Sequence, residues 1–184
     1  REYPVRFPEK RSVKDLIESE GVPHTEVGVV LVDGISAGFR RLVGEGERVT
    51  VYPHFSVLPA ERASAIERPP LDRIAFIADV HLGKLVRRLR LLGFDCEYGP
   101  DFDDPVLAER SAAENRVLLT RDRGLLMRAT VQHGIFVRSD AVHEQLLQVV
   151  RRLGINPKAP RMARCLSCNA PLRAADREAV RDRI

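Results

Sequence analysis

The chain has 184 residues, of which 44% are hydrophobic, enough to bury the core of one large domain or two small ones. With this composition, disorder is not the default expectation, and three cysteines cannot form a disulfide framework. Charge is unevenly placed within the net +4: Lys and Arg number 10 against 11 Asp and Glu in residues 1–70, and 20 against 15 in residues 71–184. A basic second half favours an anionic partner, most commonly nucleic acid.

No apolar segment near the start of the sequence resembles a signal peptide, and none has the length of a membrane span. Together with the few cysteines, this predicts a cytoplasmic protein with no membrane partner.

The pattern of residues 1–58 predicts a small β-grasp unit. We expect a short helix at Ser12–Ser19 opened by a Ser cap, and strands at Val5–Phe7, Val27–Val32 and Arg48–Val51. Asp33-Gly34 is a hairpin turn signal, and Gly44-Glu45-Gly46 marks another turn. Residues 59–70 end in Pro69-Pro70 and have no apolar periodicity, which indicates a linker.

From residue 71 onward, strand patterns alternate with helix patterns. The expected strands are Arg73–Ala78, Phe94–Tyr98, Arg116–Thr120 and Ile135–Arg138. The first helix, Leu82–Leu92, carries leucines on one face and stops at Gly93, and Asp104 is expected to cap the second helix ahead of Pro105. Four such repeats predict an α/β domain with a parallel, doubly wound sheet over residues 71–160.

Acidic residues stand where ligands bind in such sheets, outside the carboxyl ends of the strands. Asp79 follows the first strand, Asp122 the third and Asp140 the fourth, and Asp104 begins the helix after the second. Carboxylates gathered together repel one another unless a cation neutralises them, and Mg²⁺ or Mn²⁺ takes oxygen ligands. The acids therefore predict a site for Mg²⁺ or Mn²⁺, which can activate water for in-line phosphoryl displacement, the chemistry of many nucleases.

Some of these acids have a plainer explanation. Asp104 and Asp140 both sit where helix N-caps belong. Asp79 closes an apolar central strand, where an acid has little other purpose. No Ser/His/Asp or catalytic-Cys pattern competes with the acidic site.

Basic residues surround the acids and form a candidate RNA-binding face. Those on the first helix and beside Asp122 are Lys84, Arg87, Arg88, Arg90, Arg121 and Arg123. Such cations could hold substrate phosphates on either side of the scissile bond, and a solvated helix face is the alternative. Aromatic residues make up only 5% of the chain, which favours recognition of backbone and shape over base stacking.

Four segments carry a resemblance to a known family: residues 76–85 (FIADVHLGKL), 88–95 (RLRLLGFD), 118–123 (LLTRDR) and 164–169 (RCLSCN). Together they resemble the Mut-seven-C RNase family of PIN-like proteins. Residues 13–18 (VKDLIE), 21–26 (GVPHTE) and 49–53 (VTVYP) resemble the ubiquitin-like domain found ahead of that RNase domain.

The resemblance implies a PIN-like fold and divalent-metal RNase activity. Matched residue by residue, its motifs select Asp79, Asp104 and Asp122 as catalytic and metal-binding residues, and Asp140 as a looser match for a metal ligand. It also implies a zinc ribbon with two Cys-x-x-Cys pairs, of which residues 161–184 contain Cys165 and Cys168 alone. Because zinc needs four tetrahedral ligands, Zn²⁺ binding would require a second pair beyond the chain end. Cys96 is expected to be a buried apolar residue.

The leading hypothesis is a metal-dependent ribonuclease that hydrolyses RNA phosphodiester bonds, with tRNA or ribosomal RNA as substrate and the ribosome as a candidate partner. One alternative is an RNA- or ribosome-binding module with a weak or silent nuclease site, and another is a toxin-type PIN RNase. The ubiquitin-like domain would dock RNA, a ribosomal surface or its own nuclease domain, with His24 and His54 as candidate contacts.

Overall fold

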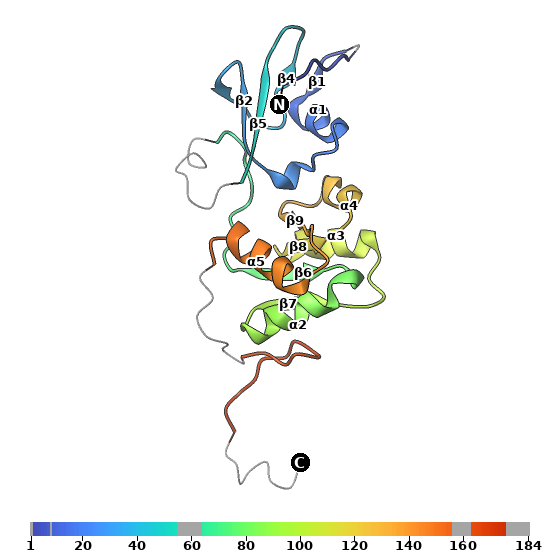
Figure 1. Cartoon of the computed structure of the whole chain (residues 1–184), viewed down its shortest axis with the longest axis vertical. Coiled ribbons are helices and arrows are strands. Elements are labelled where there is room, and N and C mark those ends of the chain that lie inside the picture. The colour runs from blue at the N-terminus through green and yellow to red at the C-terminus, as the bar shows by residue number, and fades with distance from the viewer. Residues whose placement is uncertain (1, 8, 55–63, 156–162, 176–184) are drawn as a thin grey trace.

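The structure is a computed structural model that describes residues 2–7, 9–54, 64–155 and 163–175. Two α/β domains and a short tail follow one another along the long axis of the molecule (Figure 1). We call them the N-terminal domain (residues 2–54), the sheet domain (residues 71–155) and the tail (residues 163–175).

The N-terminal domain is built around one central strand, β2 (Val27–Val32). This strand pairs antiparallel with β3 (Ile35–Ser36) and β5 (Val49–Pro53). The remaining elements are β1 (Arg11–Ser12), which pairs with β4 (Leu42–Val43), α1 (Val13–Ser19) and the 3-10 helix η1 (His24–Glu26). Buried residues of α1 pack on β2 and β4, as expected of the predicted β-grasp unit.

Local signals in this domain were largely correct. Ser12 caps α1 by accepting a hydrogen bond from the Asp15 N–H at 3.1 Å. Asp33 and Gly34 join β2 to β3 with φ of 50° and 81°, the left-handed pair that a type I′ hairpin requires. The predicted strand at Val5–Phe7 is wrong, because residues 2–7 contain no strand. Prolines at positions 4 and 8 remove backbone donors on both sides of it.

Residues 64–70 of the predicted linker form neither helix nor strand, and Ser64 and Ala65 hydrogen-bond to Gly28 and Ser36 of the N-terminal domain. The other part of the predicted linker, residues 59–63, lies outside the described residues.

The sheet domain alternates strands and helices as predicted. The strands are β6 (Ala75–Ala78), β7 (Asp95–Tyr98), β8 (Val117–Thr120) and β9 (Gly134–Phe136). The helices are η3 (Val80–Leu82), α2 (Gly83–Leu91), α3 (Asp104–Ala113), α4 (Arg123–Met127) and α5 (Val142–Arg152). All four strands run parallel in the order β7-β6-β8-β9, so the expected parallel α/β fold is confirmed.

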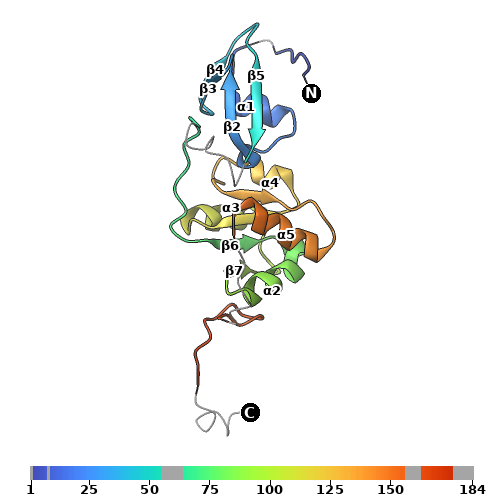
Figure 2. The same ribbon diagram turned by 60° about the vertical axis from the view of Figure 1, so that its left-hand side comes forward.

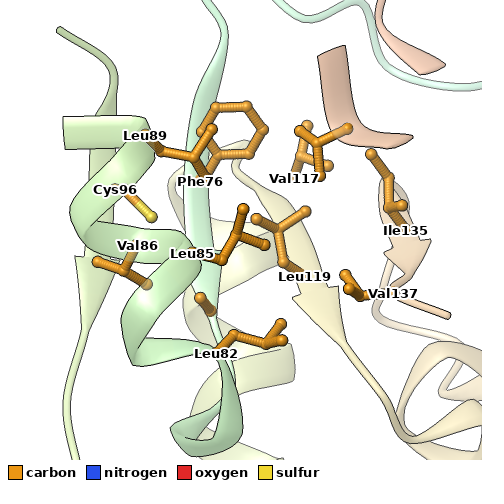
Figure 3. Packing of buried hydrophobic residues seen from close by; sticks show 12 residues of the cluster. Phe76, Leu82, Leu85, Val86, Leu89, Cys96, Val117, Leu119, Ile135 and Val137 are labelled. Carbon is orange, nitrogen blue, oxygen red and sulfur yellow. The ribbon is translucent and has the colours of Figure 1, made fainter. Parts of the chain in front are cut away.

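Helices cover both faces of this sheet because successive strand residues point to opposite sides. Phe76 and Leu119 face α2 and α5, whereas Ile77 and Leu118 face α3 and α4. Figure 3 shows the first layer, in which side chains of α2 and the preceding turn lie against the sheet. This doubly wound arrangement leaves the carboxyl ends of the strands together at one edge.

Both outer strands of the sheet contact a neighbouring segment. On β9, the Phe136 N–H donates to Glu26 Oε1 of η1 at 3.1 Å. On β7, the Cys96 N–H donates to Asn169 Oδ1 of the tail, also at 3.1 Å. The N-terminal domain and the tail therefore lie at opposite ends of the sheet, as both views show (Figures 1 and 2).

The tail folds into a tight turn against α2. Arg164 and Pro171 form a β-bridge, and the Cys165 N–H donates to the Ala170 carbonyl at 2.8 Å. Arg90, a buried residue of α2, holds the turn by donating to the carbonyls of Leu166 and Ser167, at 3.1 and 2.6 Å.

Candidate functional site

Asp79 and Asp122 lie at the carboxyl ends of two adjacent strands, β6 and β8, and one hydroxyl joins them. Thr120 Oγ1 donates to Asp79 Oδ2 at 2.8 Å and accepts from the Asp122 N–H at 2.9 Å. Thr120 is fully buried, whereas Asp79 is partly exposed and Asp122 is exposed. The position of each acid therefore depends on the same side chain.

A second set of hydrogen bonds orients the Asp122 carboxylate. Asp122 is the N-cap of α4, and its Oδ1 accepts from the N–H groups of Gly124 and Leu125 at 2.6 and 3.4 Å. Asp79 stands at the N-cap position of η3, but its side chain makes no capping bond there. Its carboxylate is directed to Thr120 instead.

The predicted cap of α3 is off by one residue. Asp103, not Asp104, accepts the capping bond from the Val106 N–H at 3.0 Å, and Asp104 is the first helical residue ahead of Pro105. Asp104 is thus not occupied as a cap. Within the described residues, however, no three His, Cys, Asp or Glu side chains lie close enough together to hold a metal ion. The structure joins Asp79 to Asp122 and leaves Asp104 apart from them.

Two carboxylates are nevertheless a donor set that suits Mg²⁺. This ion keeps several waters and is usually held by one or two carboxylates together with substrate phosphates. The capping and threonine bonds described above engage Asp79 Oδ2 and Asp122 Oδ1, and the second oxygen of each carboxylate takes no part in them. The pair thus offers carboxylate oxygens of the kind that a hard divalent cation takes as ligands.

Asp140 is placed differently from both expectations for it. The N-cap of α5 is Ala141, so Asp140 is not a cap. Its carboxylate forms an ion pair with Arg121 and is 87% exposed.

A groove of about 730 Å³ lies beside the acidic edge. Its walls come from η3 and α2, the start of α5 and the tail turn, and include His81, Lys84, Arg87, Tyr98, Arg121, Asp140, Leu166 and Ser167. A smaller hollow of about 360 Å³ shares Lys84, Arg87 and Leu166 with the groove and adds Arg88. The two hollows thus follow α2 away from the acids, past a row of exposed cations.

The predicted RNA contacts separate into three groups. Lys84, Arg87 and Arg88 are exposed and line the hollows, and Arg121 lines the groove while paired with Asp140. Arg123 lies over the Phe136 ring, 4.9 Å from its centre, on the α3/α4 side of the sheet and outside the groove.

Arg90, which was predicted to contact RNA, borders the groove but is buried. Only 4% of this residue is exposed, and its guanidinium is taken up by backbone carbonyls of Cys96, Leu166 and Ser167. The helical spacing placed it with its basic neighbours, but the tail covers that part of α2.

Several residues of the acidic edge and the groove were not expected from the sequence. Thr120 could have been found, since it is a polar residue that ends an apolar strand two positions before Asp122. Tyr98, whose hydroxyl donates to the Val80 carbonyl at 3.0 Å, and the tail residues Leu166 and Ser167 carried no such signal.

The cysteine pair of the tail lies on the turn held by Arg90, and both thiols are free. Hydrogen bonds from the backbone of Cys168 and Ser167 lower the pKa of Cys165, which favours the thiolate form that binds metals. Cys96 is fully buried, as predicted, and burial raises the pKa of its thiol to about 12.

In the described part of the chain, no helix has both the length and the apolar character needed to cross a membrane.

Comparison with protein families gives two matches. The model of the Mut7-C RNAse domain matches residues 74–184, and the model of the Mut7-C ubiquitin domain matches residues 1–58. Neither a curated protein nor a solved structure matches the chain. The first match spans more than half of the sequence and includes the acidic edge, the basic helix and the cysteine turn. The chain therefore belongs to the Mut7-C RNAse domain family and carries a ribonuclease-type domain behind a ubiquitin-like one.

Proposed function

We propose that the protein is a divalent-metal-dependent ribonuclease that hydrolyses RNA phosphodiester bonds at the edge marked by Asp79 and Asp122. The observation that carries this proposal is the Thr120 hydroxyl, which links the two acids at 2.8 and 2.9 Å directly beside a basic groove. A helix cap alone does not require two acids linked by one hydroxyl next to exposed cations. This arrangement suits a phosphodiester substrate.

Each group has a distinct role in this proposal. Asp79 and Asp122 would hold Mg²⁺ or Mn²⁺, and Asp104, which the structure leaves apart from them, would have to approach to serve as a third ligand. Such an ion, when bound, supplies an activated water and neutralises charge on the phosphoryl group. Lys84, Arg87, Arg88 and Arg121 would contact substrate phosphates, and Thr120 would keep both acids in place without touching RNA.

Structured RNA, such as tRNA or ribosome-associated RNA, is the proposed substrate. Tyr98 is the one aromatic residue among the lining residues of the two hollows, so stacking of successive bases has little support there. The row of exposed cations on α2 instead favours contacts to phosphates.

The test is to incubate the purified protein with total cellular RNA, including tRNA and ribosomes, in Mn²⁺, in Mg²⁺ or in EDTA. The Asp79→Asn variant is run beside Asp101→Asn, an exposed acid in the loop after β7 that serves as a control. We expect discrete fragments with metal for the unmodified protein and for Asp101→Asn, and none for Asp79→Asn. Cleavage that persists in EDTA, or in Asp79→Asn, would overturn the site.

A second candidate function, an RNA- or ribosome-binding module with a silent site, has one observation in its favour. Among the described residues, no third acid joins Asp79 and Asp122 in a metal-sized cluster. Under this alternative, RNA or ribosomes bind but remain intact in every lane of the same experiment.

A further inference from the structure

A separate hollow of about 310 Å³ lies between the N-terminal domain and the sheet domain. We call it the interdomain pocket. Its lining includes Val117 and Gly134, the first residues of β8 and β9, so it lies at the amino ends of the strands. Asp79 and Asp122 follow the opposite ends of their strands. The interdomain pocket is therefore distinct from the acidic edge.

Two arginines bring positive charge to this pocket. Arg68 donates through Nη2 to the carbonyls of His24 and Val27, both at 2.7 Å, and its Nη1 lies 2.8 Å from Nε2 of His54, another lining residue. Arg152 donates through Nη2 to the Thr25 carbonyl at 2.9 Å. Burial lowers the pKa of Arg152 to about 10, because it disfavours the charged form, and the Glu26 carboxylate at 3.9 Å only partly offsets this. Glu26 also accepts hydrogen bonds from Arg138 and from the Phe136 N–H. A further anion near Arg152 would thus be favourable.

Thr25, whose hydroxyl is buried, is another lining residue of the pocket. Thr25 is 2% exposed, and its Oγ1 has no hydrogen-bond partner within the described residues. It lies over another lining residue, since a Cβ built on Gly134 would be 3.4 Å from it. Folded proteins rarely leave a buried hydroxyl unpaired, because desolvation without a partner is unfavourable. Because less than 1 Å² of Oγ1 is exposed, Thr25 would turn toward the pocket for a ligand oxygen to become this partner.

The rest of the lining sets the character of the ligand. His133 donates Nε2–H to the Pro69 carbonyl at 2.8 Å, and Leu71, Val117, Ile135 and Leu153 add apolar surface. The volume lies near the lower end of the range for small-molecule sites, about 300–1,000 Å³. The pocket therefore suits a small molecule with one charged end and one apolar end.

We propose that the interdomain pocket binds a small organic oxyanion, held at its charged end by Arg68, Arg152 and the Thr25 hydroxyl and at its apolar end by the leucine and isoleucine side chains. The ligand touches both domains, so it stabilises their contact. This site does not depend on the nuclease activity, since none of its residues reaches the acidic edge.

Calorimetry and thermal unfolding of the full chain test the proposal with three probes. Phenyl phosphate and benzoate carry the two common oxyanions on an apolar ring, and benzyl alcohol is the uncharged control. We expect one or both anions to bind with one-site stoichiometry and to raise Tm, and benzyl alcohol to do neither. The tighter anion identifies the natural class as a phosphate ester or a carboxylate. No binding of either anion would overturn the proposal.

Variants locate the bound anion. We expect Arg152→Met to weaken binding about tenfold or more, the scale of one lost charged hydrogen bond, while Arg151→Met, an exposed neighbour on α5, leaves it unchanged. Arg152→Met also removes a bond between the domains, so Thr25→Val is the gentler variant: it should weaken binding without lowering the Tm of the ligand-free protein. The double variant Lys84→Ala/Arg87→Ala should bind normally. Binding that survives Thr25→Val and Arg152→Met but is lost in this double variant would place the anion in the RNA groove and overturn the proposal.

Discussion

Thr120 is the residue through which the two acids of the sheet edge are coupled. Its hydroxyl donates to one acid and accepts from the backbone of the other, from a fully buried position. Thr120→Val keeps the shape and removes both bonds, so we expect cleavage to fall about 10- to 100-fold, as when groups that orient metal ligands are removed. Thr120→Ser keeps the hydroxyl and should retain activity. Equal cleavage rates for Val and Ser would show that the hydroxyl does not position the acids.

Asp122 combines a structural bond with its proposed role, and two substitutions separate them. Asparagine is as good an N-cap as aspartate, so Asp122→Asn should abolish cleavage while leaving stability nearly unchanged. Asp122→Ala should abolish cleavage and also lower the free energy of unfolding by about 1 kcal/mol through loss of the cap. Denaturant unfolding beside the RNA assay checks both, and a fully active Asp122→Asn would remove this residue from the site.

His133 predicts how stability depends on pH. Burial lowers the pKa of His133 below its ordinary value of 6.5, and the neighbouring Arg68 charge lowers it further. Below pH 6.5 the unfolded chain therefore takes up a proton that the folded chain binds less readily, and this contribution to stability is lost as the pH falls. We expect Tm to drop between pH 7.5 and 5.5 by more in the unmodified protein than in His133→Gln. Parallel curves for the two proteins would contradict this.

At the scale of elements, α2 has two basic faces with different tasks. Arg88 is exposed and lines the outer hollow, whereas Arg90 is buried and holds the tail turn. Arg90→Met should destabilise the protein by about 2 kcal/mol, because buried carbonyls lose their donor, and should raise hydrogen exchange in residues 163–175. Arg88→Met should leave both unchanged and reduce the salt dependence of RNA binding by about one phosphate contact. If Arg88→Met lowered stability and Arg90→Met changed only RNA binding, the assignment of Arg90 to the tail and Arg88 to RNA would be contradicted.

Element positions were predictable where local signals agree with the tertiary structure. The β6, β7, β8 and β9 strands lie within two residues of their expected starts and ends. The signal was clearest for β6 and β8, which are short apolar runs buried at every position. The strand at Val5–Phe7 failed because prolines flank an apolar run that packs without pairing. The α3 cap was shifted because two consecutive aspartates offer the same local signal, and only Asp103 has the extended backbone of a cap.

At the scale of the whole molecule, Glu26 connects the two domains. It accepts from the Phe136 N–H and from Arg138, the latter at 2.6 Å, and it lies 3.9 Å from the partly buried Arg152. Glu26→Ala should lower the free energy of unfolding by about 2 kcal/mol, the range for hydrogen bonds to a charged group. Glu20→Ala, an exposed acid after α1, is the control. Denaturant unfolding measures the difference, and equal stability of the two variants would show that Glu26 contributes nothing to docking.

The two pockets show what sequence reasoning could not reach. Asp79 and Asp122 were predictable as neighbours because strand order and parallel direction bring their positions to one edge. Two features were not predictable: the groove wall that includes Leu166, and the interdomain pocket. Each of them joins segments that are distant in sequence. No local pattern shows which surface of a docked domain a given loop will meet. His24 illustrates this: its Nε2 lies 2.8 Å from the Val131 carbonyl of the other domain.

The contacts at the two outer strands have a consequence for how the protein behaves when cut. Phe136 on β9 and Cys96 on β7 each present a backbone N–H at an open sheet border, and Glu26 and Asn169 each cover one of them. Open borders of this kind recruit strands from other chains and lead to aggregation. The ubiquitin-like domain and the cysteine-containing tail therefore each cover one edge strand of the sheet. A fragment that contains the sheet domain alone should therefore self-associate through its edge strands, β7 and β9, even though its own core is complete.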